Sequence, residues 1–97
     1  MNYEIVILDS VYYELDEAID YYELKQLNLG KRLYLDFKES LKSISHSPEL
    51  YEKKHQNFRQ LKLKIFPYFL VFEVIKSQII VYRFFHAKRN PKRKFKF

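Results

Sequence analysis

The sequence contains no cysteine, one glycine and three prolines among its 97 residues. Without cysteine, neither a disulfide framework nor a thiolate zinc site can form, and a reducing compartment is expected. His46 and His55 lack the spacing of metal ligands, so we expect no metal and no other cofactor. No apolar run approaches the roughly 18–20 residues of a membrane span, and residues 1–5 show no secretory leader. These absences predict a cytoplasmic protein without a membrane partner.

Aromatic side chains are abundant, with nine tyrosines and nine phenylalanines that together make up 19% of the residues. Hydrophobic residues account for 47% of the chain. A disordered chain would have few aromatic residues and weak hydrophobicity. The composition and length therefore predict one globular domain over residues 1–97, with a basic C-terminal tail at about 87–97.

Charge is divided unequally along the chain. Residues 53–97 carry thirteen of the eighteen lysines and arginines but only one carboxylate, Glu73, which gives this half a formal charge of +12. Residues 1–52 have eleven acids against five bases, a formal charge of −6 that we assign mainly to a predicted helical hairpin. A folded surface rich in cations attracts a polyanion or an acidic protein.

The N-terminal segment is predicted to be a strand followed by a helix. Residues 3–8 form a short β-branched run that closes on Asp9-Ser10, a pair that suits a helix N-cap. From Val11 the apolar residues recur at three- and four-residue spacing, which indicates an amphipathic helix that ends near Gln26.

A second helical pattern covers residues 33–44, and Pro48 ends it. Two helices separated by so short a break should form an antiparallel hairpin. The remaining runs, 58–65, 68–75 and 79–86, are typical of strands. We therefore predict an α+β fold of order β-α-α-β-β-β, with the helical hairpin packed on one face of a mainly antiparallel four-stranded sheet.

The sheet face away from the helices is predicted to be partly apolar. If Lys76-Ser77-Gln78 is a three-residue hairpin loop, Val71 lies opposite Arg83, whereas a two-residue loop would shift this register by one residue. The residues that then share this face are Phe69, Val71, Glu73, Val81, Arg83 and Phe85, with Lys62 and Lys64 extending it. An exposed apolar face usually marks a protein interface; the alternative is that sheet twist lets the helices and the tail cover both sides.

The order of short motifs in the second half resembles a known family. Phe66–Phe72 contains a Pro-Tyr turn and a central strand, Ile79–Tyr82 is an apolar strand, and His86–Pro91 contains a His-x-x-Arg pattern. Arg59 lies where an arginine of the first of these strands is expected. Together with Pro48 after the second helix, the chain resembles the RelE/ParE superfamily of bacterial toxins over essentially its whole length.

The resemblance implies a toxin of a type II toxin–antitoxin module that a cognate antitoxin binds and neutralises in a hetero-oligomer. We expect the antitoxin to contact the apolar sheet face at Phe69, Val71, Val81 and Phe85. We expect the target to contact the cations Lys62, Lys64, Lys88, Arg89, Lys92, Arg93 and Lys94.

Family members divide by target. RelE-like toxins cut messenger RNA on the ribosome, which requires a proton acceptor for the 2′-hydroxyl and cations for the phosphate charge. The resemblance implies His86, Arg83 and Lys64 for these roles. No tyrosine follows Tyr82, however, so we favour a ParE-like toxin that inhibits DNA gyrase. A ribosome-dependent endoribonuclease and a non-toxic nucleic-acid-binding module stay open as alternatives.

The same residues have structural interpretations. His86 ends a strand, and its ring can hydrogen-bond the backbone of the following turn. Arg59 can pair with a helix carboxylate, and Glu73 can pair with Arg83 across two strands. An exposed pair of this kind contributes little to stability. Contacts in the folded chain distinguish these interpretations from catalytic ones.

Overall fold

The secondary structure follows the predicted order with one added strand. A computed structural model describes residues 3–88. The elements are β1 (Glu4–Ile7), α1 (Asp9–Lys25), α2 (Leu29–His46), the 3-10 helix η1 (Pro48–Leu50), β2 (Lys53–His55), β3 (Phe58–Lys62), β4 (Tyr68–Ile75) and β5 (Gln78–His86). The residues Arg89, Lys92, Arg93 and Lys94, expected to bind the target, lie outside the described residues.

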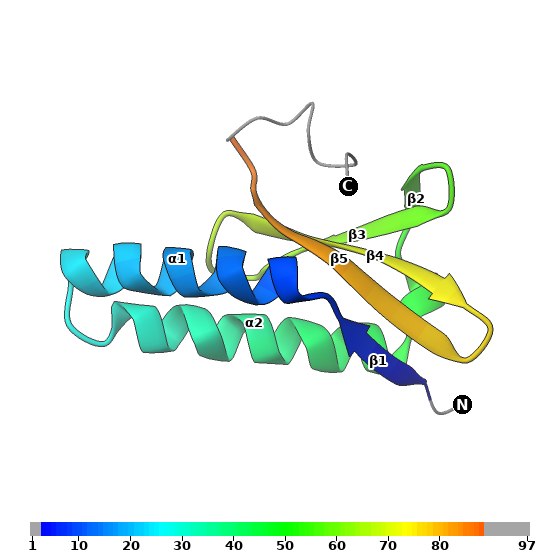
Figure 1. Cartoon of the computed structure of the whole chain (residues 1–97), viewed down its shortest axis with the longest axis horizontal. Coiled ribbons are helices and arrows are strands. Elements are labelled where there is room, and N and C mark those ends of the chain that lie inside the picture. Colours follow the sequence, from blue (N-terminus) through cyan, green and yellow to red (C-terminus); the bar gives the residue numbers. More distant parts are fainter. Residues whose placement is uncertain (1–2, 89–97) are drawn as a thin grey trace.

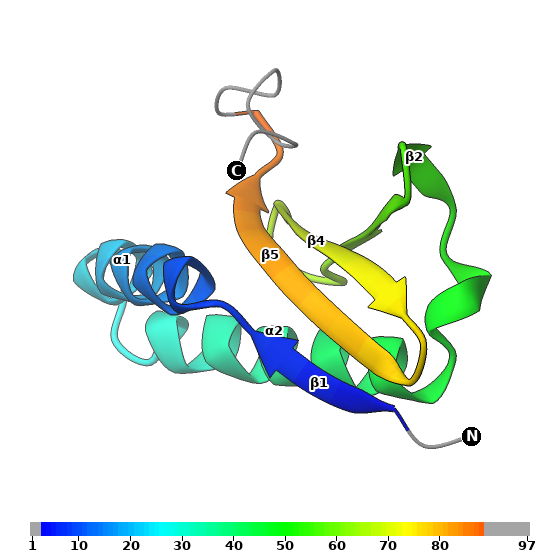
Figure 2. The same cartoon turned by 45° about the vertical axis from the view of Figure 1, so that its right-hand side comes forward.

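The strands between residues 3 and 88 form one five-stranded sheet in the order β1-β5-β4-β3-β2. Only β1 and β5 pair in parallel, and the other neighbours are antiparallel. Helices α1 and α2 lie side by side on one face of this sheet (Figures 1 and 2). The predicted α+β architecture, with a helical hairpin on a mainly antiparallel sheet, is confirmed, but the sheet has five strands and not four.

The additional strand, β2, was not predicted because its three residues are all exposed and show no apolar alternation. It is defined by pairing alone: Lys53 lies opposite Arg59, and His55 lies opposite Phe58. A short, cationic edge strand is a common way to prevent a sheet from pairing with another chain.

The connection between α1 and α2 is held by a single carboxylate. Glu23, in the last turns of α1, accepts the backbone N–H of Asn28 at 2.9 Å and that of Gly30 at 3.0 Å. Asn28 has φ = 70°, a left-handed conformation that asparagine tolerates. A Cβ atom at position 30 would lie 2.8 Å from the carbonyl oxygen of Ile19, so glycine is required for the two helices to approach this closely.

Helix α1 begins two residues earlier than the sequence indicates. Its first residue is Asp9, the N-cap position is Leu8, and no side chain caps the helix. The predicted cap at Asp9-Ser10 is therefore wrong. Ser10 instead donates its hydroxyl to the carbonyl oxygen of Tyr82 at 3.2 Å, because β1 leads directly into α1 beside β5.

The core lies between the helices and the sheet and contains stacked aromatic rings. Phe84 in β5 stacks on Tyr68 in β4 with ring centroids 4.4 Å apart, and it meets the edge of Phe37 from α2 at 5.6 Å. Tyr22 from α1 meets the edge of Phe66 at 4.9 Å. Fully burying a phenylalanine contributes roughly 1.5–3 kcal/mol, so these rings are a main source of the attachment between the two layers.

The loop between β4 and β5 has two residues, the shorter of the two lengths that the sequence allows. Ile75 pairs with Gln78, which leaves the two residues Lys76 and Ser77 as the loop. Lys76 takes φ = 55°. Tight hairpin loops usually place glycine, asparagine or aspartate at such a position, and the absence of those residues made a longer loop the natural interpretation.

A β-bulge in β5 compensates for the shorter loop. Phe72 pairs with Val81 and Val71 pairs with Arg83, so Tyr82 is the inserted residue of the bulge. The predicted pairing of Val71 with Arg83 therefore holds, although the loop that was expected to produce it does not.

The bulge also changes which residues of β5 share a face. Val81 and Phe84 both belong to the core under the helices although they are three residues apart. Phe85 is outside that core cluster. The expectation that Val81 shares a face with Phe85 is therefore wrong, because one inserted residue reverses the alternation of the strand.

Candidate functional site

The candidate site is the sheet face away from the helices, called the open face below. It carries the side chains of Gln60 and Lys62 from β3, Phe69, Val71 and Glu73 from β4, and Tyr82, Arg83 and Phe85 from β5. Strand alternation places the β3 and β4 residues there, since their neighbours Leu61, Leu70 and Phe72 lie in the core. The bulge adds both Tyr82 and Arg83.

Tyr82 is fixed by its neighbours on the open face. Its hydroxyl donates to Glu73 Oε1 at 3.0 Å, and its ring meets the edge of Phe58 with centroids 5.3 Å apart. Burial, followed by the hydrogen bond to Glu73 and the charge of that carboxylate, raises the pKa of Tyr82 above its usual value. Glu73 is thus a hydrogen-bond partner of tyrosine, and the alternative of a Glu73–Arg83 pair is wrong because Glu73 lies opposite Ile80.

Arg83 forms an ion pair with helix α1. Its Nη2 lies 2.8 Å from Oε2 of Glu14, and its Nε donates to the same oxygen at 3.1 Å. The other carboxylate oxygen of Glu14 accepts the backbone N–H of Phe84 at 3.2 Å. Strand β1 ends at Ile7 and covers β5 only as far as Val81. Glu14 therefore takes the place of a strand partner at the uncovered edge of β5.

The apolar residues expected to bind the antitoxin are less accessible than predicted. Val71 is 0% exposed and Phe85 is 6% exposed, and Phe69 is partly buried. The long side chains of Gln60 and Arg83 flank Val71 on the neighbouring strands. The guanidinium of Arg83 lies 5.3 Å from the centre of the Phe85 ring. The predicted exposed apolar patch is therefore not found at Val71 and Phe85, because polar and charged side chains cover them.

His86 ends β5 and takes part in a turn. Its Nδ1 accepts the backbone N–H of Lys88 at 3.1 Å, and its ring meets the edge of Tyr68 with centroids 5.1 Å apart. The N–H of Ala87 donates to the carbonyl oxygen of Pro67 at 2.8 Å, which joins this turn to the β3–β4 loop. Because Nδ1 is an acceptor here, the proton of the neutral ring is on Nε2.

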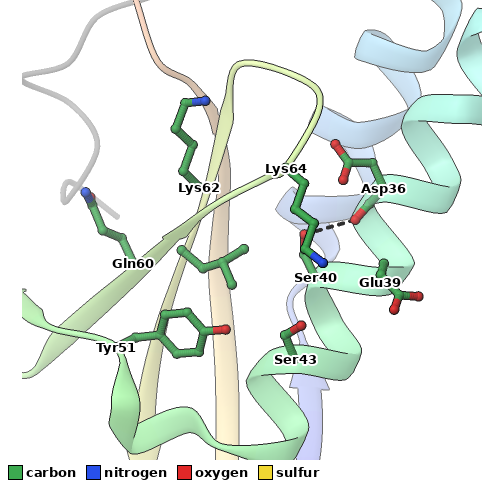
Figure 3. A pocket seen from close by; sticks show the side chains of 9 residues that line it. Asp36, Glu39, Ser40, Ser43, Tyr51, Gln60, Lys62 and Lys64 are labelled. Atoms are coloured by element: carbon green, nitrogen blue, oxygen red, sulfur yellow. Dashed lines mark hydrogen bonds between the residues drawn. The ribbon is translucent and has the colours of Figure 1, made fainter.

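Lys62 and Lys64 line a cleft between β3 and α2 and point in different directions. Lys64 turns towards α2, beside Ser40 and Glu39, whereas Lys62 points away from the helix (Figure 3). Strand β3 ends at Lys62, so the alternation that was expected to place both lysines on the open face stops before Lys64. Lys62 extends the open face as predicted, and Lys64 does not.

The cleft is bounded by a buried carboxylate that sequence reasoning missed. Asp36 of α2 is 5% exposed, and its Oδ2 accepts the backbone N–H groups of Ile65 and Phe66, both at 3.0 Å. It thereby anchors the β3–β4 loop to the helix. The available sequence signal was its position: an acid directly before Phe37 and three residues after Leu33, within the apolar stripe of the helix.

Arg59 has a structural role in the fold. Its Nη1 donates to the backbone carbonyl oxygen of Tyr51 at 2.6 Å and to that of Glu49 at 3.4 Å. These carbonyls lie at the end of η1, so Arg59 joins that short helix to β3. The expected partner, a helix carboxylate, is replaced by two backbone carbonyls.

Among residues 3–88, no group of three or more histidine, cysteine or acidic side chains lies close enough to hold a metal ion. None of the helices in this part of the chain is long and apolar enough to cross a membrane.

The structure gives each of the three candidate catalytic residues a different surrounding. Arg83 pairs with Glu14 in α1, His86 packs on Tyr68 at the end of β5, and Lys64 lies beside α2. Lys88 follows the strand and is exposed. Lys62 is exposed as well.

Comparison with solved structures places this fold among bacterial toxins. The chain superimposes on a protein of the chromosomal ParDE toxin–antitoxin system from P. aeruginosa with a TM-score of 0.73 and 17% identity, covering 89% of this chain and 97% of that one. It superimposes on the isolated E. coli RelE toxin with a TM-score of 0.65 and 21% identity, covering 93% and 89%. These likenesses concern the fold alone.

Sequence comparison identifies the family. No curated protein sequence matches the chain significantly. The family model for the ParE toxin of the type II toxin–antitoxin system parDE, however, matches residues 5–91, which is most of the chain. The chain therefore belongs to the family of ParE toxins, and it is the toxin of a type II toxin–antitoxin module whose partner is a cognate antitoxin.

Proposed function

We propose that this toxin inhibits DNA gyrase in the cytoplasm and does not cut messenger RNA. The observation that carries the proposal is the engagement of the two side chains best suited to RNA cleavage. Arg83 pairs with Glu14, and Nδ1 of His86 accepts a backbone N–H. Both side chains thus hold parts of the fold together.

The hydrogen bond that His86 accepts argues against a role as general base. Cleavage by a 2′-hydroxyl needs a group with a free lone pair to remove its proton. In the neutral ring Nε2 carries the proton, and the lone pair of Nδ1 is already directed at the N–H of Lys88. The ring therefore has no lone pair available for that proton while this turn is intact.

The same engagement limits Arg83 as a stabiliser of phosphate charge. The guanidinium lies 2.8 Å from the Glu14 carboxylate, whose negative charge offsets the positive charge that would attract a phosphate. The pair is only partly exposed, with side-chain exposures of 22% for Arg83 and 26% for Glu14. A phosphate at this position would also be repelled by the charge of Glu14, which opposes RNA binding there.

We assign target contact to exposed cations, with Lys62 on the open face and Lys88 after β5 as its described members. The other proposed members are Arg89, Lys92, Arg93 and Lys94. We keep Phe69 as a proposed antitoxin contact, and Val71 and Phe85 as contacts that require neighbouring side chains to move, because they are buried. Val81 was also expected to contact the antitoxin, but it lies in the core under the helices at 0% exposure.

A supercoiling assay with purified gyrase tests the target. We expect the toxin to inhibit supercoiling and to leave ribosome-bound messenger RNA intact. Lys62→Glu should weaken the inhibition by about tenfold, the equivalent of about 1.4 kcal/mol. Lys53→Glu, an equal charge reversal on the exposed edge strand β2, is the matched control and should have a much smaller effect.

The opposite outcome would identify a ribonuclease. Messenger RNA cut only in the presence of ribosomes, with gyrase unaffected, would contradict the proposal. Loss of that cutting in a stable His86→Ala variant would then assign the chemistry to His86. Antitoxin added before the toxin should suppress either activity, which separates a wrong target from an inactive preparation.

A further inference from the structure

The helical hairpin, including the connection between its two helices, exposes large apolar side chains. Leu24 is 90% exposed, Leu27 is 78% exposed and Tyr13 is 73% exposed. On α2, Leu35 is 53% exposed and Tyr34 is 43% exposed. Single exposed apolar residues are ordinary, but a group of this size on neighbouring helices is typical of an interaction surface.

The two helices carry opposite charge. Helix α1 has six acids against one lysine, a formal charge of −5. Helix α2 has four lysines and arginines against two acids, a formal charge of +2, and one of those acids, Asp36, is buried. The outer surface of the hairpin is therefore acidic along α1 and basic along α2.

Charged and apolar residues alternate along the same helix faces. Tyr13, Asp20 and Leu24 follow each other at spacings of seven and four residues, which places them on one face of α1. On α2, Leu35 is four residues after Lys31, three before Lys38 and seven before Lys42. The α1 face thus combines apolar side chains with negative charge, and the α2 face combines them with an excess of positive charge, since Glu39, four residues after Leu35, is the one exposed acid of α2.

We propose that this face binds a second copy of the chain and forms a symmetric dimer of helical hairpins. In this dimer α1 of each copy lies on α2 of its partner. A twofold axis parallel to the helices produces that contact twice, so each acidic face meets a basic one. Tyr13, Leu24 and Leu35 would be buried between the hairpins.

Charge selects this arrangement over the other twofold packing. An axis perpendicular to the helices would place α1 on α1 of the partner and α2 on α2, and both contacts would join like charges. A hairpin dimer also leaves the open faces of the two sheets on opposite outer sides, since the helices lie on one side of each sheet (Figure 2). Dimerisation therefore does not compete with the proposed target surface.

Sedimentation equilibrium of charge-reversed variants tests the proposal. Asp16→Lys/Asp20→Lys makes α1 basic, and Lys38→Glu/Lys42→Glu makes α2 acidic; all four residues are exposed. The wild-type chain should dimerise with rising concentration, and each variant alone should dimerise at least about tenfold more weakly. Mixed in equal amounts, the two variants should form a heterodimer, because each reversed face then meets one of opposite sign.

The matched control is Lys53→Glu/Lys54→Glu, a double charge reversal on β2 that should leave dimerisation unchanged. A wild-type chain that stays monomeric at high concentration would overturn the proposal and would indicate that the antitoxin or the target covers this face. Dimers that persist in both variants, or variants that do not associate when mixed, would overturn it as well. None of these results depends on gyrase inhibition.

Discussion

Asp36 is the single residue on which the β3–β4 loop most depends. Its carboxylate accepts two backbone N–H groups at 3.0 Å in a site that is 5% exposed. Asp36→Ala would leave both donors without a protein acceptor, and each such loss costs about 1–3 kcal/mol. We expect a loss of about 2–4 kcal/mol in the free energy of unfolding, measured by urea denaturation.

Glu39→Ala is the matched control, because Glu39 lies one turn away on α2 and is exposed. It should change the free energy of unfolding by less than about 0.5 kcal/mol. Asp36→Asn, which keeps one acceptor oxygen, should lie between the two. An Asp36→Ala variant as stable as Glu39→Ala would show that the loop does not depend on this carboxylate.

Tyr82 should make stability sensitive to alkaline pH. Its pKa in the folded chain is raised, by burial first and then by Glu73, so below its unfolded value of 10.0 the hydroxyl is protonated in both states. As the pH rises past that value, the unfolded tyrosine ionises first and the folded state loses stability until the pH passes the folded pKa. The Tyr82→Phe variant has no hydroxyl at this position to ionise, so its stability should not fall with pH for this reason.

The measurement compares urea unfolding of wild type and Tyr82→Phe at neutral pH and at about pH 11. At neutral pH the variant should be less stable by about 0.5–1.5 kcal/mol, the contribution of one hydrogen bond. At alkaline pH this difference should shrink. Tyr13→Phe, at a 73% exposed position, is the control. A difference that stays constant or grows with pH would contradict the assignment.

At the scale of elements, Gly30 determines how closely α1 and α2 approach. In an ordinary helix, replacing glycine with alanine stabilises by roughly 0.8–1 kcal/mol. Here the added Cβ would lie 2.8 Å from a backbone oxygen of Ile19, which cannot move without the helix. We therefore expect Gly30→Ala to lower the free energy of unfolding by about 1–3 kcal/mol, the usual cost of overpacking.

Thermal unfolding measures the stability of Gly30→Ala against that of Lys31→Ala. Lys31 is the next residue on the same helix and is exposed, so its replacement should have little effect. A Gly30→Ala variant that is more stable than wild type would mean that the hairpin opens at this point without cost.

Local sequence patterns specify some elements of this fold and cannot specify others. The spacing of Val11, Leu15 and Ala18 predicts α1, and the apolar run 68–75 predicts β4 with its observed ends. The bulge at Tyr82 was missed because it arises from the fit between a two-residue loop and the opposite strand. Strand β2 was missed because only its pairing with β3 defines it.

The sequence predicted the region of the candidate site better than it predicted the contacts between the side chains there. The cationic half does form most of the sheet, and Lys62 lies on the open face as expected. The partner of Arg83, however, is Glu14, which is 69 residues away in sequence. No local pattern indicates such a contact, and the preceding bulge decides where Arg83 points.

At the scale of the whole molecule, three surfaces differ in their charge. The negative charge assigned to the helical hairpin belongs to α1 alone, since α2 carries a formal charge of +2. The sheet and the residues that follow it hold most of the positive charge. An acidic helix, a basic helix and a basic sheet can thus bind different partners, and the central question is what the basic sheet binds.

The most direct test measures plasmid topology and messenger RNA integrity in the same cells shortly after the toxin is induced. Inhibition of gyrase predicts that plasmids lose negative supercoiling or acquire gyrase-linked breaks while transcripts stay full length, and that co-expression of the antitoxin prevents both growth arrest and DNA damage. Transcripts cut within coding regions while plasmid topology stays normal would contradict the proposal that the toxin inhibits gyrase.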